Sequence, residues 1–114
     1  MTLLNSATDP DLITRARAGD RRAIADLIGR HKHWLYRFVR RYVGDADDAQ
    51  DVLQESFVAA MMNLGRYDLN RPFDIWLRRI ALNKCRDRAR RLAVRRAIGL
   101  GRRTTGEPED IADP

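Results

Sequence analysis

Apolar residues in this chain recur at intervals of three and four, and no segment alternates apolar and polar residues for long enough to suggest a β-strand. The longest helical pattern follows Asp20, where these side chains fall on one face at about 100° per residue: Ile24, Leu27, Ile28, His31, Trp34, Leu35, Phe38 and Tyr42. At 114 residues the chain is long enough for one domain with one core. The sequence therefore predicts an all-α fold, a compact bundle of about four helices.

Each expected helix is bounded by residues that cap or break helices. A cap at Thr8 or Asp9 begins the first helix, and Pro72 biases Arg71 away from the α region, so that a loop must precede the last helix. The four expected helices cover residues 9–19, 20–44, 45–65 and 72–96. We predict that residues 1–97 form the ordered domain and that residues 98–114 form a flexible acidic tail.

The third and fourth helices have predicted apolar sides of their own. That of the third helix contains Ala46, Ala49, Leu53, Phe57, Ala60 and Leu64. That of the fourth contains Phe73, Trp76, Leu77, Ile80 and Lys84, with Asp87 near its edge. These sides are expected to face the core.

Most of the excess positive charge lies late in the chain. Residues 78–103 contain eleven basic residues and one acid, Asp87, in a protein whose net charge is +6. Four side chains project from the outer side of the fourth helix within about 60° of one another: Arg79, Asn83, Arg86 and Arg90. Arginine binds phosphate bidentately and asparagine can bond a base edge, so this arginine stripe is typical of a helix that lies on nucleic acid. A solvated basic face without a partner is the alternative.

One acidic segment stands out against this positive charge. The stretch DADDAQDVLQESF at residues 45–57 has five carboxylates and no base. The side chains expected on the outer side of its helix are Asp47, Asp48, Asp51, Glu55, Val58 and Met62. Attraction to the helix N-terminus accounts for acids in the first turn but not for Glu55. Carboxylates mixed with exposed apolar groups indicate a protein-binding surface.

Several classes of function are disfavoured. The single Cys85 cannot form an internal disulfide, His31 and His33 point to different sides of their helix, and there is no glycine-rich phosphate loop. We therefore expect no enzyme, metal or cofactor, and a buried, hydrogen-bonded His31. The chain has no signal-peptide pattern and no apolar run of roughly 18 residues, which predicts a cytoplasmic protein without membrane insertion.

Three segments occur in the order AGDRRAIADLIGRHKHWLYRFVRRYVGD, ADDAQDVLQESFVAAMMNLGRY and RPFDIWLRRIALNKCRDRARR. Together they resemble conserved region 2 of the bacterial extracytoplasmic-function (ECF) sigma factors of the sigma-70 family. DVLQESF is similar to the family's D-[LIV]-V-Q-E-[TA]-F, and WLRRIALNKCRDRARR to its W-L-x-x-I-A-x-N-x-x-x-D-x-x-R-R. The resemblance covers about residues 9–96 and implies a fold like that of sigma-70 region 2.

The resemblance implies two partners on two surfaces. The helix with the acids would dock on the clamp helices of the β′ subunit of core RNA polymerase, through Asp48, Asp51, Gln54, Glu55, Phe57 and Val58. The next helix and its preceding loop, Tyr67 to Asp74, would recognise and open the promoter −10 element, and the loop would hold an unstacked base. The implied DNA-binding residues are Arg71, Phe73, Asp74, Trp76, Arg79, Asn83, Arg86, Asp87 and Arg90. An anti-sigma factor is the third implied partner.

Some features depart from the family pattern. Met61 stands where the family often has tryptophan, and Cys85 lies in the helix that would read the promoter. The acidic tail resembles the beginning of a linker to region 4, which is absent, so we expect a domain of a longer protein or else a natural single-domain regulator. A basic helical DNA-binding protein of another family, with no polymerase contact, is the main alternative function. A protein-only adaptor that uses the acidic face is another.

Overall fold

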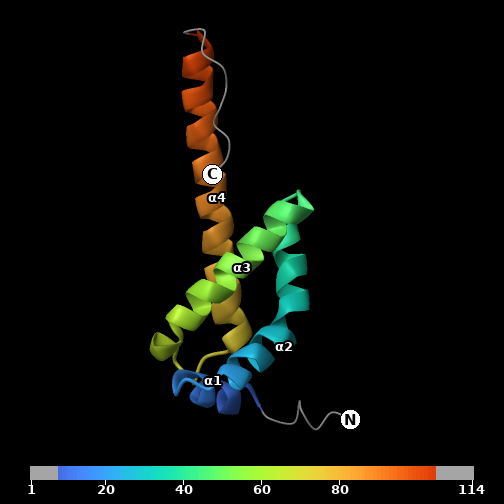
Figure 1. Cartoon of the computed structure of the whole chain (residues 1–114), viewed down its shortest axis with the longest axis vertical. Coiled ribbons are helices and arrows are strands. Elements are labelled where there is room, and N and C mark those ends of the chain that lie inside the picture. The colour runs from blue at the N-terminus through green and yellow to red at the C-terminus, as the bar shows by residue number, and fades with distance from the viewer. Residues whose placement is uncertain (1–7, 105–114) are drawn as a thin grey trace.

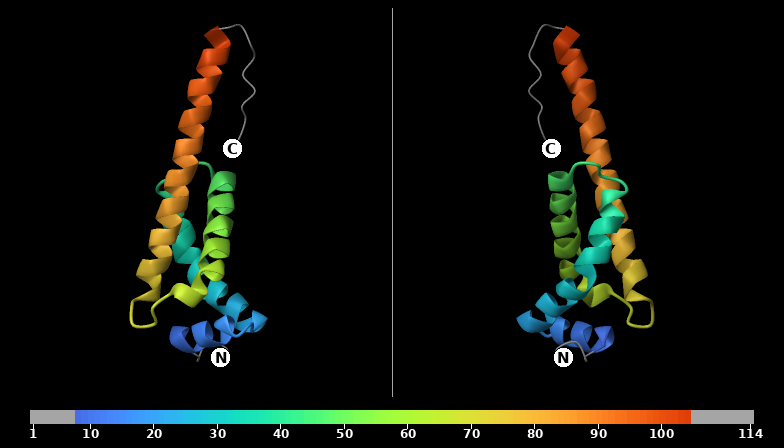
Figure 2. Two further views of the ribbon diagram at one scale, coloured as in Figure 1. Left: turned by 90° about the vertical axis from the view of Figure 1, so that its left-hand side faces the viewer. Right: turned by 90° about the vertical axis from the view of Figure 1, so that its right-hand side faces the viewer.

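The structure, a computed structural model, describes residues 8–104, with side chains up to residue 99. Its described elements are α1 (Asp9–Arg17), α2 (Arg21–Arg40), α3 (Ala46–Met62), the 3-10 turn η2 (Leu64–Arg66) and α4 (Phe73–Thr104). The first three helices pack with the beginning of α4, and the rest of α4 extends beyond them (Figure 1). The two side views in Figure 2 show the same extension. The prediction of an all-α fold of four helices is confirmed. The bundle consists of α1, α2, α3 and the beginning of α4, and the rest of α4 stands outside it.

Local hydrogen bonds fix both ends of α1. Thr8 is its N-cap: its hydroxyl accepts from the Asp11 amide at 3.3 Å, and the Asp11 carboxylate accepts from the Thr8 amide at 3.4 Å. At the other end, Gly19 has φ +94°, a backbone conformation that glycine adopts without steric cost. Asp20 follows at once and caps α2 by accepting from the Arg22 amide at 3.0 Å. The turn from α1 to α2 is therefore set by adjacent residues.

The helix α2 ends earlier than predicted, and this changes which residues reach the core. It stops at Arg40, with Val39 and Val43 buried and Tyr42 55% exposed. Tyr42 was expected on the apolar face because the helical wheel was continued to Gly44. Since the chain leaves the helix after Arg40, Val43 packs inward in its place.

The helix α3 is buried on a wider face than its wheel predicts. Asp45 caps it as expected, by accepting from the Asp48 amide at 2.9 Å. Ala46 is exposed, whereas Val52 and Ser56 are buried. The cause is that α3 packs against both α2 and α4, so residues beyond the predicted apolar side are also covered. The Ser56 hydroxyl donates to the Val52 carbonyl at 2.7 Å, which satisfies this buried polar group.

The buried side of α4 repeats every fourth residue, at Phe73, Leu77, Ala81 and Cys85. This buried side is turned about the helix axis relative to the predicted apolar side, so that Trp76, Ile80 and Lys84 are only partly buried. Small side chains at positions 81 and 85 occupy little space between α4 and its neighbours. Pro72 lies just before the helix, where its carbonyl accepts from the Trp76 amide at 3.2 Å.

The α4 helix continues past its predicted end near residue 96 to Thr104. No proline occurs in this stretch, and a glycine costs only about 1 kcal/mol relative to alanine in a helix interior. The predicted flexible tail was therefore wrong for residues 98–104, which are helical. Residues 105–114 lie outside the described part of the chain. Within that part, no helix combines the length and the apolar character needed to cross a bilayer.

Candidate functional site

The outer face of α3 collects the predicted protein-binding residues around one hollow. A depression of about 620 Å³ between α3 and α4 is lined by Asp51, Gln54, Glu55, Val58, Ala59, Met62, Asn63 and Lys84. Val58 is 53% and Met62 80% exposed, and the two lie together at this hollow, as apolar residues do at binding surfaces. Four of the six predicted polymerase-binding residues thus share one surface: Asp51, Gln54, Glu55 and Val58. We call this surface, together with the adjoining Met62, the acidic face.

The other two predicted residues have different surroundings. Asp48 forms an ion pair with Arg88 of α4 at 2.5 Å, and the Arg88 side chain is only 13% exposed. The Phe57 side chain is buried in the core, 7% exposed. Neither side chain lines the first hollow, and a direct polymerase contact through either one stays a prediction. Asp48 joins α3 to α4, and Phe57 packs.

A second hollow, of about 690 Å³, lies on the other side of α3 against α2. Its apolar lining includes Ile28, Leu53 and Met61, and Lys32 stands at its polar part. Sequence reasoning did not assign these residues to a site. The sequence feature that could have indicated this hollow is the pair Met61 and Met62, since flexible apolar side chains at a surface are typical of protein-binding sites. The acidic face is therefore a ridge between two depressions.

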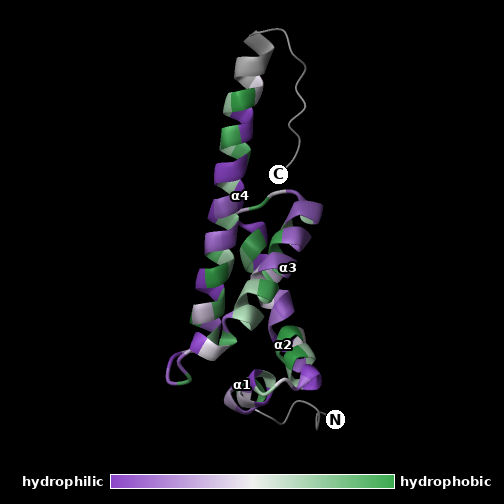
Figure 3. Ribbon diagram, turned by 60° about the vertical axis from the view of Figure 1, so that its left-hand side comes forward, coloured by the Kyte–Doolittle hydropathy of each residue, from purple (hydrophilic) through white to green (hydrophobic). Residues whose placement is uncertain are grey.

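The arginine stripe of α4 is exposed as predicted. Arg79, Asn83, Arg86 and Arg90 all lie at the surface, and Figure 3 shows hydrophilic residues along much of this helix. Asp87 is partly buried and forms an ion pair with Arg90, one turn along the same helix. The Arg90 side chain is still 71% exposed, so it stays among the outward groups of the stripe with Arg79, Asn83 and Arg86.

The loop that precedes α4 is held by several polar contacts. Tyr67 is buried, and its hydroxyl donates to the Arg71 carbonyl across the loop. Within the loop, the Asp68 carboxylate accepts from the Asn70 amide at 2.9 Å, and the Asp68 carbonyl accepts from the Arg71 amide at 2.9 Å. Leu69 at the tip is 39% exposed. The loop is therefore an ordered structure with an exposed tip.

Aromatic rings form a continuous cluster under this loop. The Phe73 ring lies 5.3 Å from that of Tyr67, 5.5 Å from that of Trp76 and 5.1 Å from that of His31, between ring centroids. Phe73 is 7% exposed and Trp76 is partly buried. In the structure both rings pack under the loop, and Phe73 also lines the hollow beside it. That the two residues bind DNA stays a prediction.

A hollow of about 550 Å³ lies between this loop and the first two helices. It is lined by Asp9, Pro10 and Ile13 of α1, by Arg30, His31 and Trp34 of α2, and by Tyr67, Leu69, Arg71, Pro72, Phe73 and Asp74. The lining residues from Tyr67 to Asp74 belong to the loop that was predicted to hold a base, whereas the residues of α1 and α2 were not predicted. Nothing in the local sequence pattern places them beside a loop that lies more than thirty residues away along the chain.

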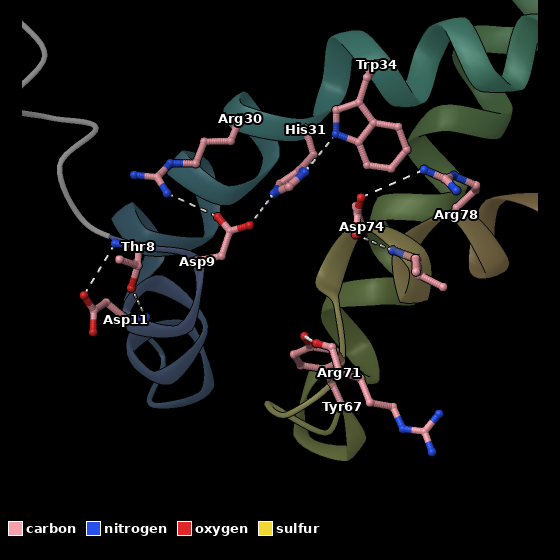
Figure 4. Close-up of polar contacts among 11 residues, drawn as sticks. Thr8, Asp9, Asp11, Arg30, His31, Trp34, Tyr67, Arg71, Asp74 and Arg78 are labelled. Carbon is pink, nitrogen blue, oxygen red and sulfur yellow. Dashed lines mark hydrogen bonds and ion pairs between the residues drawn. The ribbon is translucent and has the colours of Figure 1, made fainter.

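A hydrogen-bond network stiffens the wall formed by α1 and α2. Figure 4 shows Asp9 between Arg30, at 3.2 Å, and the His31 Nε2, at 2.9 Å. The Trp34 indole N–H donates to the His31 Nδ1 at 2.9 Å. Because Nδ1 accepts this bond, the proton lies on Nε2 and faces Asp9. The expected buried, hydrogen-bonded His31 is confirmed.

Burial controls the titration of two groups near these surfaces. Burial is the main cause that raises the pKa of Tyr67 above 10.0; Asp9, Asp68 and Asp74 raise it further, and Arg17 lowers it. The Tyr67 phenol therefore stays protonated at neutral pH and can donate to Arg71. Burial also raises the pKa of the Cys85 thiol, which keeps it a packing residue at neutral pH. Among the described residues, no three His, Cys, Asp or Glu side chains could hold a metal ion together.

These features define a small helical domain with an acidic and apolar surface on α3 and a basic surface on α4. A model of the family described as Sigma-70 region 2 matches residues 27–96. The chain belongs to this family, and its relatives make it region 2 of an ECF sigma factor. The alternative of a DNA-binding protein from another family is therefore wrong. The relatives described next are sigma factors, and no family of enzymes is indicated among them.

Two curated relatives illustrate the similarity. The ECF RNA polymerase sigma factor SigW of Bacillus subtilis is 38% identical over 79 residues, which are 69% of this chain and 42% of the relative. The RNA polymerase sigma factor CnrH of Cupriavidus metallidurans is 39% identical over 101 residues, 89% of this chain and 52% of the relative. The chain thus spans about half the length of the curated relatives it matches.

Two solved structures share the fold. An engineered region 2 of sigmaE, solved by NMR in complex with GTAAAA, has a TM-score of 0.67 and 36% identity, and the match covers 85% of this chain and 93% of that one. CnrH in complex with the cytosolic domain of CnrY has a TM-score of 0.64 and 41% identity, and the match covers 82% of this chain and 64% of the CnrH structure.

Proposed function

We propose that this domain binds core RNA polymerase through the acidic face of α3, with the clamp helices of the β′ subunit as its partner. The observation that carries the proposal is the combination of Asp51 and Glu55 with the exposed Val58 and Met62. Acids would pair with a basic helical partner, and the apolar groups would lose their exposed surface on docking.

The second surface serves promoter DNA. Arg79 and Arg86 would bind phosphates, and Asn83, which stands between them, would bond a base edge. The similarity to a region 2 solved with GTAAAA supports a nucleic-acid role for this domain. If about five phosphates are neutralised, the logarithm of affinity falls with the logarithm of salt with a slope of roughly −3.5 to −4.5.

The hollow under the loop is the proposed place for an unstacked base of the −10 element. Taking a base out of the stack costs a few kcal/mol, which stacking and edge hydrogen bonds must return. Arg71 and Asp74 offer polar groups at the hollow, and the buried aromatic cluster gives it a firm floor. The domain would act by capturing the opened strand, without ATP or metal.

A protein that covers one or both surfaces would keep the domain inactive. CnrH, a relative, has been solved in complex with the cytosolic domain of CnrY. We propose that this chain has an anti-sigma partner of its own and that it works in the cytoplasm with the polymerase. A region 4 that follows residue 114 in a longer protein stays a prediction.

The test is association of the full chain with purified core RNA polymerase. Glu55→Lys places a positive charge against the proposed basic partner and should weaken association about 100-fold. Asp26→Lys on α2 changes the net charge equally and lies outside the acidic face, so it should leave association unchanged. Circular dichroism checks that both variants stay helical. Equal association of wild type and Glu55→Lys would remove the acidic face as the polymerase site.

A further inference from the structure

The loop before α4 is tied to α1 by a single side chain. Arg17, the last residue of α1, donates from Nε to the Leu64 carbonyl at 3.0 Å and from Nη2 to the Tyr67 carbonyl. These contacts join residues 47 and 50 positions apart, and they act where the chain leaves η2 for the loop. A guanidinium with two carbonyl acceptors holds its partners in one orientation.

The other end of α1 is fixed to α2. Asp9, the first residue of α1, contacts both Arg30 and His31, as Figure 4 shows. The helix between Asp9 and Arg17 is a short rigid segment, held by its capping box and by the buried Leu12 and Ile13. The two walls of the hollow, α2 on one side and the loop on the other, are therefore connected through α1.

We infer that Arg17 is a positioning residue for base capture, which sets the loop at a fixed distance from α2 so that the hollow exists before a base arrives. This inference rests on the proposed function. A pocket that is already ordered avoids the entropy cost of ordering on binding. Arg17 itself does not line the hollow and acts through the carbonyls of Leu64 and Tyr67.

The experiment compares three variants of the full chain. Arg17→Met removes the guanidinium and keeps an unbranched side chain, and Arg17→Lys keeps the charge and one donor group. Arg15→Met is the matched control, since Arg15 is exposed on the same helix and its side chain has no hydrogen bond or ion pair within residues 8–104. All variants are first checked for equal helicity.

Binding is measured to single-stranded DNA that contains GTAAAA and to strands in which each of its bases is replaced in turn. Arg17→Met should reduce the discrimination between these strands about tenfold while the salt dependence stays that of Arg15→Met. Arg17→Lys should recover part of the discrimination. Amide hydrogen exchange at Asn70 and Arg71 should become faster in Arg17→Met and remain unchanged in Arg15→Met.

The outcomes separate the two proposals. Equal discrimination and equal exchange in Arg17→Met and Arg15→Met would overturn the role of Arg17. Faster exchange without lost discrimination would also overturn it, because loosening the loop would then have no effect on base preference. If the wild type itself shows no base preference, base capture by this domain is refuted, and the inference about Arg17 falls with it whatever the exchange rates are.

Discussion

The outer faces of α3 and α4 differ in charge and in exposed apolar surface. On α3, the carboxylates of Asp51 and Glu55 are followed along the same face by Val58 and Met62, which are 53% and 80% exposed. On α4, arginines and Asn83 are exposed, and among the described side chains no large apolar one is exposed between Ile75 and Val94. The α3 face offers apolar area together with negative charge, whereas the α4 face offers mostly positively charged hydrogen-bond donors and the amide of Asn83, which both donates and accepts.

This difference indicates different binding physics. Burial of apolar surface depends little on moderate salt, so association through α3 should survive salt changes better than association through α4. Binding of α4 to a phosphate backbone releases counterions and should weaken steeply with salt. The two faces can therefore be tested separately in one molecule.

The largest effect on the α4 side is expected from the one uncharged polar residue in the stripe. Asn83→Ala should reduce discrimination among −10 sequences by about 1–3 kcal/mol, the usual scale for a bidentate base contact. Affinities for a panel of single-base variants measure this. An equal loss of affinity for every sequence would instead make Asn83 a backbone contact, and α4 would read no base at that position.

A smaller effect is expected where the two faces meet. Arg88→Met removes the ion pair with Asp48, which joins α3 to α4 and is only partly exposed. The free energy of unfolding should fall by about 1 kcal/mol in urea denaturation. Arg86→Met is the control, because Arg86 is exposed and has no ion pair in the described part of the chain. Equal stability of the two variants would show that the faces are held together by apolar packing alone.

The smallest effect concerns a single phosphate contact. Arg86→Ala should weaken binding to all DNA sequences alike and make the salt slope shallower by about one. Its association with core polymerase should equal that of the wild type at each salt concentration. An unchanged DNA slope would place Arg86 away from the backbone, and a change in polymerase binding would mean that the two faces are not independent.

Local signals predicted the helix starts and the outward faces. Thr8, Asp20 and Asp45 cap their helices through side chains that bond nearby amides, so the relevant partners are three residues away or fewer. The same holds for the stripe, since spacing on one helix fixes which side chains share a side. Packing between helices was harder to predict: Ser56 is buried because α3 has two neighbours, which its own pattern does not record.

The hollow under the loop could not be predicted for a related reason. It exists because Arg17 reaches Leu64 and Tyr67, and because Asp9 reaches α2. Such contacts depend on how α1 lies in the folded molecule. The family resemblance indicated the loop but not its support from α1.

The loop before α4 consists of a frame and a tip. The frame is held by the Tyr67 carbonyl and hydroxyl and by the Arg71 carbonyl, while Leu69 and Asn70 lie exposed between them. Substitutions at the tip disturb no buried contact, so they should leave the stability of the domain nearly unchanged. If the hollow captures a base as proposed, a change at Leu69, which lines it, could alter base preference at little cost to stability. The preference would then be free to evolve, because this residue is not one of those that maintain the fold.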